Sequence, residues 1–297
     1  GALYVAEASV VSISYASRFE YNAALGGAGG AILGSNITTL ATSGVSTFYR
    51  NSAVTAGGPL FTMGCDATIG DEAIFEPNSA GTFGGAIGAE RSSLTIGDLQ
   101  GSRVTFANNT AISGDRGAMS FDGGEGVADI DAAVLTINGL TSFTGNGATN
   151  SSGGALHVQS SLLTIAGNAT FQFNIGGIDG GAVHTTQCPE VGVRGRAVFE
   201  SNRVAGSGGA FYGGSCDKVP LDNAVFRSND ATWGDEGTTG LLLGKAIVPV
   251  IVSKGAVALV SCGEDETVQG SAAVTLACTF DSNSASDGGG IVLCLWV

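Results

Sequence analysis

The chain has 297 residues, of which 49 are glycine and only 5 are proline, and 43% of its residues are hydrophobic. Collagen is excluded because the glycines follow no three-residue period, and this hydrophobic content is too high for a disordered chain. Lys and Arg number 12 against 26 acidic residues, and the net charge of −14 repels nucleic-acid phosphates and anionic membrane surfaces. We therefore expect a folded protein with no nucleic-acid partner.

One short element recurs along the whole chain: a phenylalanine followed three residues later by an asparagine. The nine pairs are Phe19–Asn22, Phe48–Asn51, Phe75–Asn78, Phe106–Asn109, Phe143–Asn146, Phe171–Asn174, Phe199–Asn202, Phe226–Asn229 and Phe280–Asn283. Successive phenylalanines are 29, 27, 31, 37, 28, 28, 27 and 54 residues apart, and the last step is twice 27. The double step predicts a degenerate coil or an insertion around residues 230–279, within one domain that covers residues 1–297.

Each repeat also carries a glycine pair and two apolar runs. The pair follows most of the asparagines by five to seven residues, and alternating runs such as Ser93–Ile96 and Val134–Ile137 precede the next phenylalanine. Sustained helical spacing is missing throughout the sequence. A period of about 28 residues with three short strands and three bends predicts an all-β fold, a right-handed parallel β-helix of about ten coils.

Stacking of coils explains the choice of residues at the repeated positions. Each strand would pair with the same strand of the coils above and below it, about 4.8 Å away. Like residues then lie over like, so we expect an inward column of phenylalanines and a ladder of asparagine amides in the bend. The glycine pair allows tight turning and close approach of successive backbones.

The paired signatures FEYN…GGAI, FEPN…GGAI, FTGN…GGAL, FQFN…GGAV and FESN…GGAF resemble the repeats of the polymorphic outer-membrane protein family. Similar repeats occur in large secreted β-helix proteins of algae and other protists. The resemblance covers essentially the whole chain and implies a β-helical protein at the cell surface or outside the cell. In the polymorphic outer-membrane proteins such passengers act in adhesion.

Six cysteines suggest an oxidising compartment. They are Cys65, Cys188, Cys216, Cys262, Cys278 and Cys294. Cys188 and Cys216 each lie eight residues after the first glycine of their pair, so they occupy the same place in consecutive coils, at a spacing compatible with a disulfide. We predict a Cys188–Cys216 bridge and a Cys262–Cys278 bridge around the acidic loop 263–270, and hence an extracellular or cell-surface protein.

Four sequons offer sites for N-linked glycans, at Asn36, Asn108, Asn150 and Asn168. About three would arise by chance in a sequence with this content of Asn, Ser and Thr, so the number alone proves nothing. Asn36 and Asn150 lie in polar bends, whereas Asn108 lies next to the expected asparagine ladder.

The sequence carries none of the usual catalytic or cofactor-binding motifs. It contains two histidines and lacks Ser/His/Asp spacing, a zinc-protease motif, an EF-hand loop and a P-loop, so we predict no catalytic, cofactor or metal site. His157, His184 and Tyr212 each lie four residues after the first glycine of their pair and should stack on successive coils. They form either a metal- or sugar-binding stripe on an outer face or a stack of like residues in like positions, and we favour the second interpretation.

The stretch 241–260 contains Lys245, Pro249 and Lys254. Because these residues interrupt its apolar residues, we expect no membrane span.

Three classes of function remain open. Both chain ends resemble unfinished coils, which expose strand edges and apolar core. We expect a non-enzymatic building block of an extracellular fibre or surface coat that stacks head to tail with itself, or a segment of a longer rod.

The first alternative is an autotransporter-like surface adhesin that binds host or glycan ligands through its bends. The second is a polysaccharide-degrading enzyme, which needs clustered carboxylates with basic partners. Acidic residues occur at Asp122, Glu125, Asp129 and Asp131, but the basic residues are dispersed. We therefore interpret this cluster as a solvated acidic loop or a weak Ca²⁺ surface.

Overall fold

The computed structural model of the chain describes residues 1–7, 10–97, 101–113, 117–124, 133–216, 218–231, 241–244, 251–252, 257–261, 273–285 and 291–295. All regular elements among these residues are β-strands, which form three parallel sheets. The first sheet comprises β1 (Leu3–Ala6), β5 (Ile32–Ser35), β9 (Leu60–Met63), β13 (Ile87–Glu90), β17 (Met119–Asp122), β21 (Leu156–Gln159), β25 (Val183–Thr186), β29 (Phe211–Gly214), β32 (Leu241–Gly244), β37 (Ile291–Leu295) and β34 (Val257–Ser261).

The second sheet contains two strands of most coils. Its first ladder comprises β2 (Val10–Ile13), β6 (Thr39–Thr42), β10 (Asp66–Ile69), β14 (Ser93–Ile96), β18 (Val134–Ile137), β22 (Leu162–Ile165) and β26 (Val191–Val193). Its second ladder comprises β3 (Ser17–Glu20), β7 (Val45–Tyr49), β11 (Glu72–Glu76), β15 (Arg103–Ala107), β19 (Leu140–Thr144), β23 (Asn168–Gln172) and β27 (Ala197–Glu200). The sheet continues into β30 (Lys218–Arg227), β35 (Ala273–Asp281) and β33 (Ile251–Val252).

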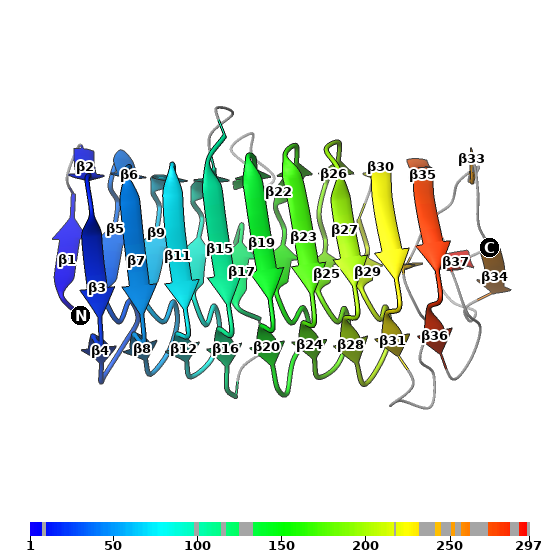
Figure 1. Cartoon of the computed structure of the whole chain (residues 1–297), viewed down its shortest axis with the longest axis horizontal. Helices are drawn as coiled ribbons and strands as arrows, with labels where there is room; N and C mark the ends of the chain where they lie inside the picture. Colours follow the sequence, from blue (N-terminus) through cyan, green and yellow to red (C-terminus); the bar gives the residue numbers. More distant parts are fainter. Residues whose placement is uncertain are drawn as a thin grey trace.

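The third sheet consists of short strands that follow the asparagines. They are β4 (Ala23–Ala24), β8 (Ser52–Ala53), β12 (Ser79–Ala80), β16 (Thr110–Ala111), β20 (Gly147–Ala148), β24 (Ile175–Gly176), β28 (Arg203–Val204), β31 (Asp230–Ala231) and β36 (Ser284–Ala285). In Figure 1 the chain descends along front strands such as β3 and β7, climbs along rear strands such as β1 and β5, and advances from the N-terminus on the left. The solenoid is therefore right-handed.

A complete coil has four strands and four corners, one more of each than the sequence predicts. In the coil β5–β8 the corners lie at Asn36, Gly44, Arg50 and Gly57, with φ values of 50°, 73°, 50° and 57°. Left-handed φ turns the chain within one residue, and the additional strand is the two-residue strand after the asparagine, such as Ser52–Ala53. At the glycine-pair corner the backbones approach closely, because a Cβ on Gly58 would collide with the carbonyl oxygen of the next coil's Gly85.

The phenylalanines form a continuous stack inside the solenoid. From Phe19 to Phe226, ring centroids of successive coils are 4.5 to 5.1 Å apart and the rings are nearly parallel. Phe19 in the first coil is half-buried, and the rings from Phe48 to Phe226 are fully buried. The backbone of Phe280 pairs with Phe226, although the Phe280 side chain lies outside the described residues.

The asparagines form a ladder of buried amides beside this stack. In the middle of the rod, the backbone N–H and the Nδ2 of Asn146 both donate to Oδ1 of Asn174, at 3.0 Å each. Nδ2 of Asn146 also donates to the carbonyl of Phe106, at 3.0 Å. The same bonds to the next oxygen repeat at every step from Asn22 to Asn283.

The described rod has fewer coils than the sequence predicts. The nine strands of the third sheet, from β4 to β36, enclose eight turns rather than about ten coils. Since β30 pairs with β35 and β31 pairs with β36, the coil of Asn229 adjoins the coil of Asn283 directly. β32 takes its regular place in the first sheet between β29 and β37, so the insertion lies between β32 and β35. Strands β33 and β34 of the insertion pair on β35 and β37, out of sequence order.

The ladder predicts a large loss of stability on Asn146→Ala. The backbone N–H and Nδ2 of Asn109 would lose their acceptor and the carbonyl of Phe106 would lose its donor, all within the buried bend. With ~1–3 kcal/mol for each buried unsatisfied group, we expect the free energy of unfolding to fall by ~3 kcal/mol or more.

Urea denaturation of unglycosylated protein from a bacterial host measures this change. Asn150→Ala, at an exposed position, is the control and should change the free energy by less than ~0.5 kcal/mol. Equal urea midpoints for the two variants would contradict the proposed contribution of the ladder to stability.

Candidate functional site

The column of His157, His184 and Tyr212 lies on the outer side of the first sheet. The three residues pair in register on β21, β25 and β29, and their rings stack with centroids 4.8 and 4.9 Å apart. Only 5% of His157 is exposed, and His184 and Tyr212 are half-buried. The glycine-pair corners lie against the bases of these side chains, since a Cβ on Gly153 or Gly208 would lie 3.2 or 3.1 Å from the Cβ atom of His184 or Tyr212, respectively.

Burial disfavours the charged forms of His184 and Tyr212. It lowers the pKa of His184 to about 4, and Nδ1 of His184 has no hydrogen-bond partner in the described part of the chain. Burial, and then the charge of Asp179, raises the pKa of Tyr212. Burial also raises the pKa of Asp179, opposed by a 2.8 Å hydrogen bond from the Ser207 N–H. A neutral imidazole stacked between two rings fits a structural role for His184 in packing.

Cys188 and Cys216 lie side by side in consecutive coils. Each is two residues beyond the paired Thr186 and Gly214, and both thiols are buried. A hydrogen bond with the Cys216 side chain, followed by burial, raises the pKa of the Cys188 thiol. Their bridge stays a prediction. Cys65 is a buried free thiol in a distant coil.

The other predicted cysteine pair lies outside the described side chains. Cys262 is not among the described residues, and only the backbone of Cys278 and of Cys294 is described. Of the acidic cluster, Asp122 ends β17 and its carboxylate accepts a 2.9 Å hydrogen bond from the Gly124 N–H. The other three acidic residues of that cluster lie outside the described residues.

All four sequon asparagines are exposed. Asn36, Asn108 and Asn150 lie in bends, and Asn168 begins β23. Their surroundings differ from those of the ladder asparagines, because Asn109, next to Asn108, is fully buried and its Nδ2 donates two hydrogen bonds. Exposure leaves these four amides accessible to modification.

Two grooves on the surface were not predicted from the sequence. One has a volume of about 600 Å³ and lies at the corner after the first sheet, where Thr38, Cys65, Asp66, Arg91 and Ser92 line it. The other has a volume of about 450 Å³ and lies over the third sheet, with a lining that is largely apolar. Its lining includes Thr110, Gly145, Gly147, Ala148, Ile175, Gly176, Gly177 and Arg203. Gly147 and Gly176, which lie in the consecutive third-sheet strands β20 and β24, were the signal that sequence reasoning missed.

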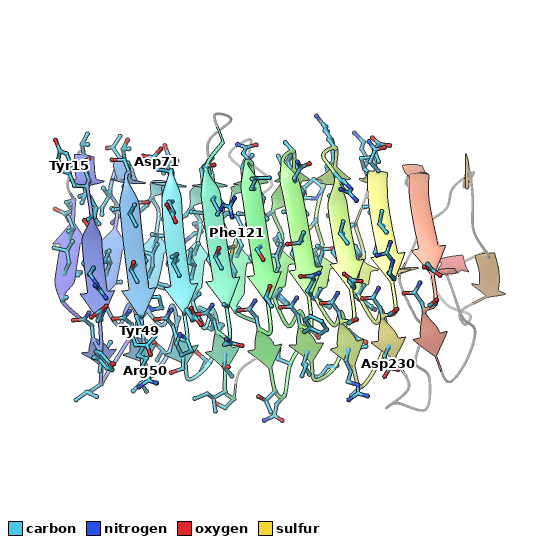
Figure 2. The ribbon with its side chains drawn as sticks, in the orientation of Figure 1. Tyr15, Tyr49, Arg50, Asp71, Phe121 and Asp230 are labelled. Carbon is cyan, nitrogen blue, oxygen red and sulfur yellow. The ribbon has the colours of Figure 1, made fainter. Side chains whose placement is uncertain are left out.

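The sequence also did not predict a cluster of aromatic and basic side chains at the lower corner of the coils, at the lower left of Figure 2. Tyr49 and Arg50 project there from the second coil. The ring of Tyr49 meets that of Tyr21 edge-on at 5.7 Å, and the Arg50 guanidinium lies 5.2 and 5.9 Å from the two ring centroids. Tyr and Arg are enriched in protein interfaces, so this cluster is a candidate contact surface.

The geometry defines the class: the chain is a parallel β-helix repeat protein. A scan against protein-family models and searches of curated proteins and of solved structures found no match. The resemblance to the polymorphic outer-membrane protein repeats therefore stays a prediction. Within the described residues, neither a helix able to cross a membrane nor a group of three metal-ligating side chains is found.

The depressed pKa of His184 predicts an acid-sensitive rod. The pKa of His184 is about 4 in the folded state and 6.5 in the unfolded state. The contribution of neutral His184 to the free energy of unfolding is therefore complete above pH 6.5 and declines as the pH falls toward 4. Over this pH range the free energy of unfolding falls by ~3 kcal/mol.

Urea midpoints at pH 7.5 and pH 4.5 measure this effect. His184→Phe keeps the stack and removes the titration, so we expect it to lose less stability on acidification than the wild type. Parallel losses in the two proteins would show that His184 does not titrate on unfolding.

The thiol geometry predicts that oxidised glutathione joins Cys188 to Cys216. The two thiols lose two protons and two electrons, an S–S bond forms, and glutathione disulfide is reduced to two glutathione molecules. A bridge that closes 28 residues should stabilise the fold by ~3.5 kcal/mol. Peptide mapping and a Cys216→Ser control check the bond, and full alkylation of both thiols after oxidation would contradict it.

Proposed function

We propose that the protein is a non-enzymatic building block of an extracellular fibre or surface coat, and that copies stack head to tail. The observation that carries this proposal is the polarity of the asparagine ladder. In the bonds between asparagines, each coil donates to Oδ1 of the next coil and accepts from the previous one, from Asn22 to Asn283. Oδ1 of Asn22 is therefore an acceptor for the donors in the last coil of another copy. A head-to-tail contact of this kind does not close into a ring.

The first coil supports this proposal with its strand edge and its side chains. The Leu3 N–H bonds to Ala31 in the second coil, so the alternating N–H of Tyr4 points to the opposite, open side. Phe19 is half-buried and stacks on Phe48, its neighbour in the second coil. A further coil on this edge would pair the strand and cover the ring.

An extracellular setting is part of the proposal. It is supported by the adjacent thiols of Cys188 and Cys216, which are placed for a disulfide, and by four exposed sequons. The cluster of Tyr21, Tyr49 and Arg50, in which Tyr21 and Arg50 are exposed, instead favours the second candidate function, a surface adhesin that binds a ligand at its corners.

Tyr4→Pro tests the head-to-tail contact. Proline removes the N–H that points to the open side, while the bonds from β1 to β5 stay intact. Electron microscopy should show fibres of the wild type and of the control Tyr4→Ala, which keeps the N–H, and only short rods of Tyr4→Pro. Short monodisperse rods of the wild type at every concentration would overturn the proposal, and saturable binding to a glycan would then favour the adhesin.

A further inference from the structure

The groove over the third sheet lies beside a column of corner residues. Asn108, Gly145 and Phe173 occupy the same corner in three consecutive coils, with φ values of 55°, 64° and 56°. Backbone N–H groups of the three donate to Thr144, Gln172 and Glu200 of the respective next coils, which fixes this alignment. Gly145 also lines the groove.

Asn108 leans over the glycine of the next coil. Its Oδ1 lies 2.7 Å from the place that a Cβ on Gly145 would take, so the missing side chain makes room for the amide. No hydrogen bond of the Asn108 side chain is found within the described ranges, and the residue is exposed. Thr110, the third residue of the same sequon, lines the groove. The acceptor amide and the groove are therefore adjacent.

Phe173 occupies its corner at a conformational cost. Left-handed φ is an outlier for a bulky residue, and the next coils have serine at the same corner, at Ser201 and Ser228. Its side chain is nevertheless 58% exposed, next to Ile175, which is 51% exposed and lines the groove. The left-handed conformation belongs to the corner and recurs at Tyr21 and Arg50, but packing within the rod does not explain why this ring is exposed, so a ligand of the corner is the better explanation.

We propose that Asn108 carries an N-linked saccharide that lies across Gly145 and packs against Phe173 and the groove. This inference rests on the extracellular setting of the proposed function. The sugar comes from a polyprenyl pyrophosphate donor: its anomeric C–O bond breaks, a C–N bond to Nδ2 of Asn108 forms, one amide proton is lost, and polyprenyl pyrophosphate leaves. Two coil spacings, about 10 Å, separate Asn108 from Phe173 and suit the length of a disaccharide.

The apolar lining fits this occupant. A pyranose ring has an apolar face that packs on an aromatic ring, while its hydroxyls stay in water at the rim. A saccharide attached at the rim needs no affinity of its own to stay near the groove, because the covalent bond supplies a high effective concentration. Weak apolar contacts are therefore enough to hold it.

Secretion of the full chain from a eukaryotic host tests the proposal. Peptide mass mapping measures occupancy of each sequon, and thermal unfolding compares Asn108→Gln, Phe173→Ser and the double variant. We expect the glycan to raise Tm by about 2–4 °C when Phe173 is present and by much less when it is serine. Asn168→Gln is the matched control, because Asn168 begins β23 and lines neither groove, so its effect should not depend on Phe173.

A second measurement does not depend on stability. The N-acetyl methyl protons of the first sugar should shift upfield in the NMR spectrum of the wild type, because of the Phe173 ring current, and return in Phe173→Ser. An unoccupied Asn108, or equal glycan effects with and without Phe173, would overturn the proposal. If other sequons are occupied and Asn108 is not, this inference fails alone; if none is occupied, the extracellular setting of the proposed function fails with it.

Discussion

The buried amide of each ladder asparagine is the contact on which the rest of the rod depends. Asn146 joins three coils, since its Nδ2 donates to the carbonyl of Phe106 behind it and to Oδ1 of Asn174 ahead of it. In the low dielectric of the interior these aligned amides strengthen one another, and an unpaired amide is costly. A slip of one residue would break the bonds and also turn the phenylalanine column outward, so the ladder fixes the register of the neighbouring sheets.

The ladder constrains the inside of each corner and leaves the outside free. Most residues that precede a ladder asparagine have left-handed φ, with Pro77 as the exception, and the chain places residues as different as Tyr21, Arg50 and Phe173 there. Because their side chains project away from the buried amides, these residues vary without disturbing the stack. The coils therefore differ from one another in surface chemistry mainly at their corners, as in the cluster around Arg50 and the groove beside Phe173.

The sequence predicted what stacking determines and missed what loops determine. The F-x-x-N period records the coil directly, and Phe106 pairs with Phe143 although 37 residues separate them. The cover over His157 and the groove at Gly145 depend on the paths of corner backbones, which leave no period. The 54-residue step misled the count of coils for the same reason: a step of two periods is also what an insertion produces, and Phe226 pairs directly with Phe280.

Insertions are tolerated because the ladder acts only at one corner. The backbone N–H of Asn51 reaches the next oxygen at 2.9 Å over 27 residues, and that of Asn229 reaches its partner at 3.0 Å over 54. Loop closure costs free energy only logarithmically with length, so added residues weaken the rod little provided that they enter away from the asparagine. The polarity of the ladder survives every insertion. A rod built in this way therefore keeps two unlike ends, and any assembly through those ends has a direction.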